Sequence, residues 1–158
     1  MAEMGLFAGL PLWGGALGGL VGGLLNDFLI RSTGSVRLSR AIVAMAGKSI
    51  GGMLIVASLF VEDGRNVMLV LAAVKFFGDW SLSTQWGAIT DVAGPAAGTI
   101  FGIINTCGSL GGFAAGPVMG FVKQEYGWDA LFILVASVYG AAALCWLLID
   151  SSRRLTAD

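Results

Sequence analysis

Charged and polar side chains recur at helical spacing inside one long apolar stretch of this chain. Lys75 and Asp79 are four residues apart, so on a helix their side chains can meet and form an ion pair. A helix turns by about 100° per residue, which brings two hydroxyl side chains and a tryptophan within about 40° of Asp79. Together these residues form what we call the polar stripe: Lys75, Asp79, Ser83, Trp86 and Thr90.

The polar stripe runs through the segment "DWSLSTQW", residues 79–86. A loop has no reason to keep a helical register, so we interpret this segment as helix with one polar face. Charges inside an apolar span are costly, and they usually face a bundle interior or a water-filled path. We therefore take Lys75, Asp79, Ser83 and Trp86 as candidate substrate contacts. Two alternatives stay open: an ion pair that only neutralises itself, and a Lys75 ammonium that reaches the membrane surface.

A second polar patch lies in the next apolar stretch, in "GIINTCGSLGG", residues 102–112. Asn105 and Ser109 are one turn apart, so both side chains lie on the same face of a helix. A buried asparagine needs hydrogen-bond partners. Either a neighbouring helix or a bound substrate would supply them, and both alternatives stay open for Asn105.

The composition is that of a membrane protein. The chain is 56% hydrophobic and 12% charged, with a mean hydropathy of +0.84, whereas soluble domains carry about 25% charged residues. Histidine is absent, and the two cysteines fit no metal-ligand spacing. We therefore expect no enzyme activity, no catalytic residue, no metal and no cofactor. The chain lacks a basic cluster, so we expect no nucleic-acid partner either.

The apolar runs reach ~20 residues, which is enough to cross the ~30 Å of hydrocarbon in a bilayer. Barrel strands would alternate polar and apolar residues, and these runs do not. Short connections between the runs make sequential helices antiparallel neighbours. The sequence thus predicts an all-α membrane protein with five transmembrane helices, whose approximate bounds are 6–30, 40–61, 66–90, 96–122 and 128–149.

The lysines and arginines near the ends of these spans indicate the orientation, because such residues are enriched on the cytoplasmic side. With the N-terminus outside, five would lie in the cytoplasm: Arg31, Arg37, Arg40, Arg153 and Arg154. Only Arg65 and Lys123 would lie outside. We expect an integral protein of a bacterial inner (plasma) membrane, with its N-terminus outside and its C-terminus in the cytoplasm.

Glycine is unusually frequent, with 25 residues against 3 prolines. Glycines four residues apart form a groove on one helix face, where a neighbouring helix can approach closely. We expect packing at three such rows: Gly14, Gly18 and Gly22; Gly15, Gly19 and Gly23; and Gly108, Gly112, Gly116 and Gly120. We also expect the third and fourth spans to pack closely at Gly98 and Gly102.

Two motifs resemble those of the major facilitator superfamily. "GLLNDFLIR", residues 23–31, resembles the G-x-x-x-D-x-x-x-R signature at the inner ends of helices in that superfamily. Gly23, Asp27 and Arg31 occupy its fixed positions, but Phe28 stands where a basic residue is usual. Residues 86–117 resemble the tenth-to-eleventh helix region of the anion:cation symporter branch, which carries sugar acids and other organic anions. The matching residues are Trp86, Asp91, Gly98, Thr99, Asn105, Gly111 and Gly112.

The resemblance covers about residues 6–149 and implies that the spans are the eighth to twelfth of twelve helices. Residues 1–158 would then be part of a secondary active transporter for a small organic anion such as a sugar acid, working by alternating access and coupled to a proton or sodium ion. The resemblance further implies that Asn105 contacts the substrate. Trp86 and Ser83 would line the cavity, and Gly23, Asp27 and Arg31 would form a gating motif.

The first seven helices of the family fold have no counterpart in residues 1–158. The expected partners are therefore the organic anion, the coupling ion, the lipid bilayer, and the missing N-terminal helices or a complementary half. The alternative is a truncated or split five-helix membrane protein with a structural or partner-binding role and no transport of its own.

Overall fold

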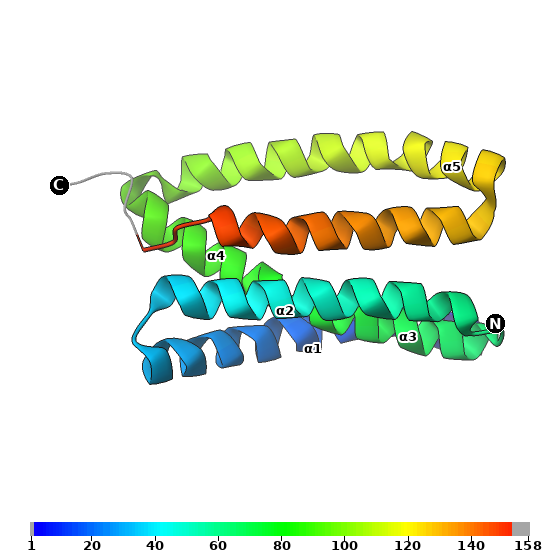
Figure 1. Cartoon of the computed structure of the whole chain (residues 1–158), viewed down its shortest axis with the longest axis horizontal. Coiled ribbons are helices and arrows are strands. Elements are labelled where there is room, and N and C mark those ends of the chain that lie inside the picture. Colours follow the sequence, from blue (N-terminus) through cyan, green and yellow to red (C-terminus); the bar gives the residue numbers. More distant parts are fainter. Residues whose placement is uncertain (1, 153–158) are drawn as a thin grey trace.

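The computed structural model describes residues 2–152, with side chains from residue 9 onward, as helices that lie side by side along one direction (Figure 1). These residues contain no strand, which confirms the all-α prediction. The elements are α1 (Ala2–Thr33), α2 (Val36–Ala57), the short 3-10 turn η1 (Ser58–Phe60), α3 (Gly64–Gly78), α4 (Trp80–Ala93), a second 3-10 turn η2 (Gly94–Ala96) and α5 (Ala97–Leu148).

Three stretches are long and apolar enough to cross a membrane: Gly9–Thr33, Val36–Phe60 and Gly64–Leu148. The last has 85 residues, far more than the ~20 that one crossing needs. It is also not one straight helix, as the turns described below show. The chain is thus an all-α integral membrane protein, while the count of five spans and their bounds stay a prediction. Arg153 and Arg154 lie outside the described residues.

The chain reverses direction inside α5. Gly127 has φ 83° and ψ −175°, a backbone conformation that glycine adopts far more readily than other residues. The segments before and after it, residues 97–126 and 128–148, run back along each other (Figure 1). We call them the first arm and the second arm of α5.

A two-residue turn connects α1 to α2 at the opposite end of the bundle. Gly34 has φ 69°, and its N–H donates to the Ile30 carbonyl at 2.9 Å, which closes the last turn of α1. The Ser35 hydroxyl then accepts from the Leu38 N–H at 3.3 Å and caps the start of α2. We refer to the two ends of the bundle as the Gly34 end and the Gly127 end.

The third predicted span is broken at Asp79, where α3 ends and α4 begins. The Ser81 hydroxyl donates to the Gly78 carbonyl at 2.9 Å. Such a side-chain bond competes with the helical ladder and favours a bend. The prediction of an unbroken helix over 66–90 is therefore wrong at this point. The remainder of "DWSLSTQW", from Trp80 onward, is helical, as the register of the polar stripe predicts.

The first glycine row of α1 packs directly on α3 and α4. A Cβ on Gly18 would collide with the backbone oxygen of Phe76, and one on Gly22 would stand 2.5 Å from the Trp80 Cα. Both helices advance by four residues between these contacts, so they run parallel with their backbones in close approach. The predicted groove at Gly14, Gly18 and Gly22 is confirmed.

The glycines of the first arm are not used in this way. A Cβ on Gly98 or Gly102 would meet nothing within 4 Å, and the same is true of the row from Gly108 to Gly120. The predicted close contact between the third and fourth spans at Gly98 and Gly102 is therefore wrong. The physical reason is that α5 packs mainly on α2, chiefly through its second arm, which leaves most of the first arm exposed.

Candidate functional site

Lys75 and Asp79 form the predicted ion pair across the break between α3 and α4. The Lys75 ammonium lies 2.9 Å from one carboxylate oxygen of Asp79 and 3.0 Å from the other. The Asp79 side chain is 20% exposed and that of Lys75 is 43% exposed. The ammonium thus pairs within the bundle rather than reaching for a membrane surface.

At Asp79 and Ser83, the polar stripe faces α1. A Cβ on Gly15 would stand 2.5 Å from the Asp79 carboxylate. The Ser83 hydroxyl donates a hydrogen bond to the backbone carbonyl of Gly19. The second glycine row of α1 therefore provides room for the polar side chains of α3 and α4, and Ser83 ties α4 to α1. Sequence reasoning placed these side chains on one face correctly, but it did not identify α1 as the helix opposite them.

Trp86 and Asn105 lie elsewhere, where α4 meets the start of the first arm. The Trp86 indole is 51% exposed, and its ring centroid lies 4.4 Å from that of Phe101. Asn105 follows Phe101 by one helical turn and is exposed. The structure thus divides the predicted contacts into two groups: Lys75, Asp79 and Ser83 against α1, and Trp86 and Asn105 beside α5.

A cavity of roughly 360 Å³ lies between α4, the first arm and the end of the second arm. Gln85, Ile100, Ile104 and Trp146 are among the residues that line it. The lining is apolar apart from Gln85 and the Trp146 indole, so these side chains suit packing or an apolar part of a ligand. Among the described residues, no group of three His, Cys, Asp or Glu side chains could hold a metal ion.

The residues of the predicted gating motif lie near the Gly34 end. Asp27 and Arg31 are both exposed, and neither forms an ion pair with any described residue. A Cβ on Gly23 would lie 3.6 Å from the Cβ of Ser83, so Gly23 belongs to the packed row of α1. The gating role of this motif stays a prediction.

Sequence reasoning missed Tyr139, which connects the second arm to the break at Asp79. Its ring is held by glycines of two helices: a Cβ would stand 2.9 Å from it at Gly51 and 3.2 Å from it at Gly78. The Lys48 ammonium lies 5.0 Å from the centre of the same ring, which is cation–π distance. Lys48 of α2 thus lies against the second arm of α5.

Lys48, Lys75 and Asp79 act on one another electrostatically, because the charges of Lys75 and Asp79 both reach the Lys48 ammonium. Lys48 forms no ion pair or hydrogen bond with any described residue besides its contact with Tyr139. Two ammonium groups and one carboxylate thus lie near one another, and the carboxylate pairs with Lys75 alone among the described residues. When all three are ionised, this group of three carries one excess positive charge, which attracts anions.

A second ion pair that the sequence did not reveal joins α2 to α4 near the Gly34 end. The Arg40 guanidinium lies 2.5 Å from the Asp91 carboxylate. The Arg40 side chain is only 6% exposed, whereas that of Asp91 is 55% exposed. The sequence held one signal for this pair, because Arg40 near the start of α2 and Asp91 near the end of α4 carry opposite charges at similar depths in the bundle.

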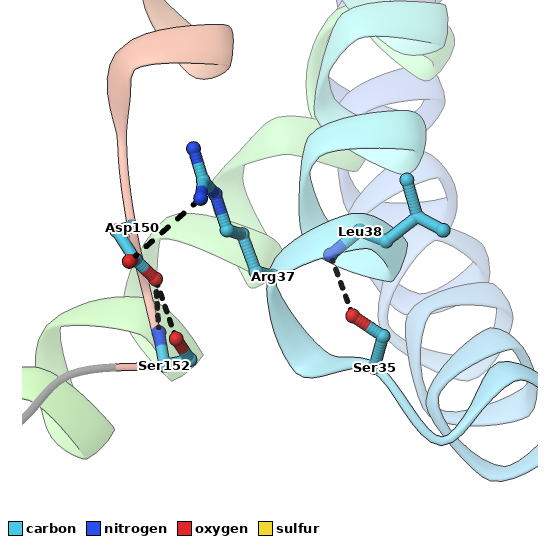
Figure 2. A network of polar contacts seen from close by, with 5 residues as sticks. All are labelled: Ser35, Arg37, Leu38, Asp150 and Ser152. Carbon is cyan, nitrogen blue, oxygen red and sulfur yellow. Dashed lines mark hydrogen bonds and ion pairs between the residues drawn. The ribbon is translucent and has the colours of Figure 1, made fainter.

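A third ion pair, at the same end of the bundle, joins α2 to the residues that follow α5 (Figure 2). The Arg37 guanidinium lies 3.8 Å from the Asp150 carboxylate, just beyond the end of α5. Asp150 also accepts hydrogen bonds from the Ser152 hydroxyl at 2.5 Å and the Ser152 N–H at 3.1 Å. Arg37 and Arg40 thus connect the first turns of α2 to the ends of α5 and α4.

Comparison with known proteins found several transporters over nearly the whole chain, although no family model matches it. The chain is 31% identical over 151 residues to the probable sulfoacetate transporter SauU of Cupriavidus necator, covering 95% of this chain and 35% of the relative. It is 26% identical over 149 residues to the probable galactarate/D-glucarate transporter GudP of Bacillus subtilis, covering 93% of the chain and 32% of the relative.

A plant protein is also similar to nearly the whole chain, which again covers only part of the relative. The chain is 24% identical over 155 residues to the chloroplastic probable anion transporter 1 of Oryza sativa, covering 98% of the chain and 29% of the relative. The chain thus spans about a third of the length of the curated relatives it matches. All three relatives are named as transporters rather than enzymes. Nearly the whole chain is therefore similar to one part of transporters named for sulfoacetate, galactarate/D-glucarate or anions, which agrees with the resemblance to the organic-anion branch of the major facilitator superfamily.

Proposed function

We propose that the chain is the C-terminal part of a secondary active transporter for a small organic anion such as a sugar acid. The observation that carries this proposal is the match of 93–98% of the chain to transporters whose names specify sulfoacetate, galactarate/D-glucarate or anions. The excess positive charge of Lys48, Lys75 and Asp79 supports an anionic rather than a cationic substrate.

The turns of the backbone support the proposal of five membrane crossings. α1 and α2 are separated by the turn at Gly34, and Gly127 separates the two arms of α5. If α3 and α4 together form one bent crossing, the chain crosses the membrane five times. Five crossings would put the two termini on opposite sides of the membrane. The distribution of lysines and arginines supports an N-terminus outside and a C-terminus in the cytoplasm of an inner-membrane protein.

Among the proposed substrate contacts, Asn105 and Trp86 are the two residues that are exposed. Both side chains are exposed, Trp86 on α4 and Asn105 on the neighbouring first arm of α5. An amide and an aromatic face are therefore available to the carboxylate and hydroxyl groups of a sugar acid. Lys75 and Asp79 are the proposed charged part of the same pathway, and Ser83 would position α4 through its bond to Gly19.

The Gly34 end is the proposed cytoplasmic gate. Arg40–Asp91 and Arg37–Asp150 hold α2 to α4 and to the end of α5, so the described helices can move as one unit during alternating access. Asp27 and Arg31 are exposed at the same end. They are therefore free to pair with helices of the remaining part of the transporter, and the coupling ion would be a proton or sodium.

Uptake by a completed transporter tests this proposal. The chain would replace the matching third of SauU from Cupriavidus necator, and radiolabelled sulfoacetate and glucarate uptake would be measured in proteoliposomes with an imposed proton or sodium gradient. We expect uphill uptake of at least one anion, driven by one of the gradients. A chimera that folds and inserts but takes up neither anion would contradict the transport assignment.

The second candidate function is a helix-binding membrane protein without transport of its own. The exposed, glycine-rich face of the first arm favours it, because that face has no neighbour within 4 Å at Gly108, Gly112, Gly116 or Gly120. This candidate predicts stable association with other membrane helices together with a complete lack of uptake in the chimera.

A further inference from the structure

A groove of roughly 430 Å³ lies between α2 and the second arm of α5, which run side by side (Figure 1). Its apolar lining comes from both helices: Gly52, Met53, Val56, Ala136 and Gly140. The two polar side chains among its lining residues are Lys48 and Ser49, which are neighbours in α2. We call this hollow the Lys48 groove.

The Lys48 groove contains a positive charge without a counter-charge. The Lys48 ammonium lies over the Tyr139 ring but forms no ion pair with any described residue. Asp79 acts on it only from a distance, because that carboxylate pairs with Lys75 at 2.9 Å. The Ser49 hydroxyl also lacks a hydrogen bond to any described residue. A buried or half-buried charge needs a partner, so the groove is suited to a ligand with one negative charge.

The depth of Lys48 restricts what that ligand can be. Lys48 is the twelfth residue from either end of the apolar stretch Val36–Phe60, which places it about 18 Å from each end at 1.5 Å per residue. The charged head of a phospholipid stays at the membrane surface, because a fixed charge is costly at this depth. A carboxylic acid can reach Lys48, since its carboxyl group can take up a proton and enter an apolar medium uncharged.

The rest of the Lys48 groove fits a single apolar chain. Gly52 and Val56 follow Lys48 by one and two helical turns, so the three residues lie on one face of α2. Opposite them, a Cβ on Gly140 would meet nothing within 4 Å, which leaves open space. The volume falls within the roughly 300–1,000 Å³ of small-molecule sites. The groove thus combines a positively charged end with an apolar length.

We propose that the Lys48 groove is a binding site for a fatty acid, whose one carboxyl group is attached to an unbranched apolar chain. The carboxyl group pairs with the Lys48 ammonium and accepts a hydrogen bond from the Ser49 hydroxyl. The chain then runs along Gly52 and Val56 toward the Gly127 end. One carboxylate balances the excess positive charge of Lys48, Lys75 and Asp79. None of the proposed substrate contacts lines this groove, so the site is separate from the proposed transport function.

Photolabelling tests the site on the 158-residue chain in detergent micelles. The probe is palmitic acid that carries a photoreactive diazirine on its chain. We expect labelling of the peptide that contains Met53 and Val56, with competition by palmitic acid but not by its methyl ester. Lys48→Met should reduce labelling about ten-fold, as for loss of one hydrogen bond to a charged group. Lys123→Met is the matched control and should label normally, because the Lys123 ammonium also lies over an aromatic ring, that of Trp128, but outside the groove.

Gly140→Leu provides a second variant that keeps Lys48 and does not depend on how Lys48→Met folds. The leucine side chain fills the groove without a backbone clash, so labelling should fall by a similar factor. Gly116→Leu is its control, since a Cβ on Gly116 also meets nothing within 4 Å but lies on the first arm. Undiminished labelling of Gly140→Leu, or equal competition by palmitic acid and its methyl ester, would overturn the site. Competition by phosphatidylglycerol but not by palmitic acid would also overturn it, in favour of a phospholipid.

Discussion

The hydroxyl oxygen of Tyr139 lies against Gly78, the last residue of α3, and a Cβ on Gly78 would stand 3.1 Å from that oxygen. This contact places the second arm of α5 directly beside the break at Asp79. The residue that allows it is a glycine, so the approach depends on the absence of a single methyl group. Lys48 lies over the same ring, so three helices meet at this point.

Gly78→Ala should destabilise the bundle by crowding Tyr139. We expect a loss of about 1–3 kcal/mol, the usual cost of an added methyl group at a packed contact. Tyr139→Phe removes the oxygen that the new methyl would meet, so the double variant should be less destabilised than the sum of the single effects. Unfolding in mixed micelles, followed by circular dichroism, measures all three. Strict additivity would show that Gly78 and Tyr139 do not interact.

Gly18→Ala and Gly116→Ala should differ strongly, although both replace one glycine of a regular row. A Cβ on Gly18 would collide with the backbone oxygen of Phe76, which cannot move aside without shifting α3. A Cβ on Gly116 would meet nothing within 4 Å. We expect a lowered unfolding midpoint for Gly18→Ala and no loss for Gly116→Ala. A comparable loss at Gly116 in the isolated chain would contradict the packing of the first arm.

Neutralising Asp91 should cost more stability than neutralising Arg40, although the two residues form one ion pair. Asp91→Asn leaves a guanidinium that is almost fully buried without its counter-charge, and breaking such pairs costs roughly 3 kcal/mol or more. Arg40→Met leaves Asp91, which is half exposed and can be solvated, so the loss should be smaller. The double variant should recover most of the stability lost in Asp91→Asn. Unfolding midpoints decide this, and a larger loss for Arg40→Met would contradict the observed burial.

Lys75→Met and Lys48→Met should have opposite effects on the amount of folded protein. Lys75→Met leaves the Asp79 carboxylate, which is 20% exposed, without its partner at 2.9 Å. Lys48→Met instead removes an ammonium that no described carboxylate pairs with, so folded protein should be maintained or increased. Fluorescence-detected size-exclusion chromatography compares the two. If Lys48→Met were as damaging as Lys75→Met, the contact with the Tyr139 ring would be the dominant interaction of Lys48.

Asn105→Ala and Trp86→Ala should weaken anion uptake by the completed chimera without reducing its expression. Both side chains are exposed, so their truncation removes little packing, whereas a substrate contact would be lost. We expect a rise in KM of about ten-fold, as for loss of one good polar contact. Thr90→Val, on an exposed residue of the same helix, is the control. Unchanged uptake in both alanine variants would remove these residues from the substrate site.

Several features could be predicted from the sequence because they depend on local chemistry. Composition alone indicates a membrane protein, since so few charged residues cannot solvate a soluble surface. The spacing of Lys75 and Asp79 predicts their pairing because a helix brings residues four apart together. The row of Gly14, Gly18 and Gly22 predicts a close helix contact for the same reason, and the structure shows one.

Tertiary structure decided which helices these faces meet. The sequence shows that Ser83 lies on the face of Asp79, but only the packing brings that face to α1, where Ser83 bonds to Gly19. Tyr139 carried no signal of its own, because a tyrosine near the centre of an apolar span fits many positions, and its place depends on glycines 61 and 88 residues away in the chain. The glycines of the first arm show the reverse case: their pattern is as regular as that of α1, yet no described helix reaches them. Periodicity records that a face is suited to close contact, whereas the identity of its partner depends on distant segments whose relative positions no local pattern encodes.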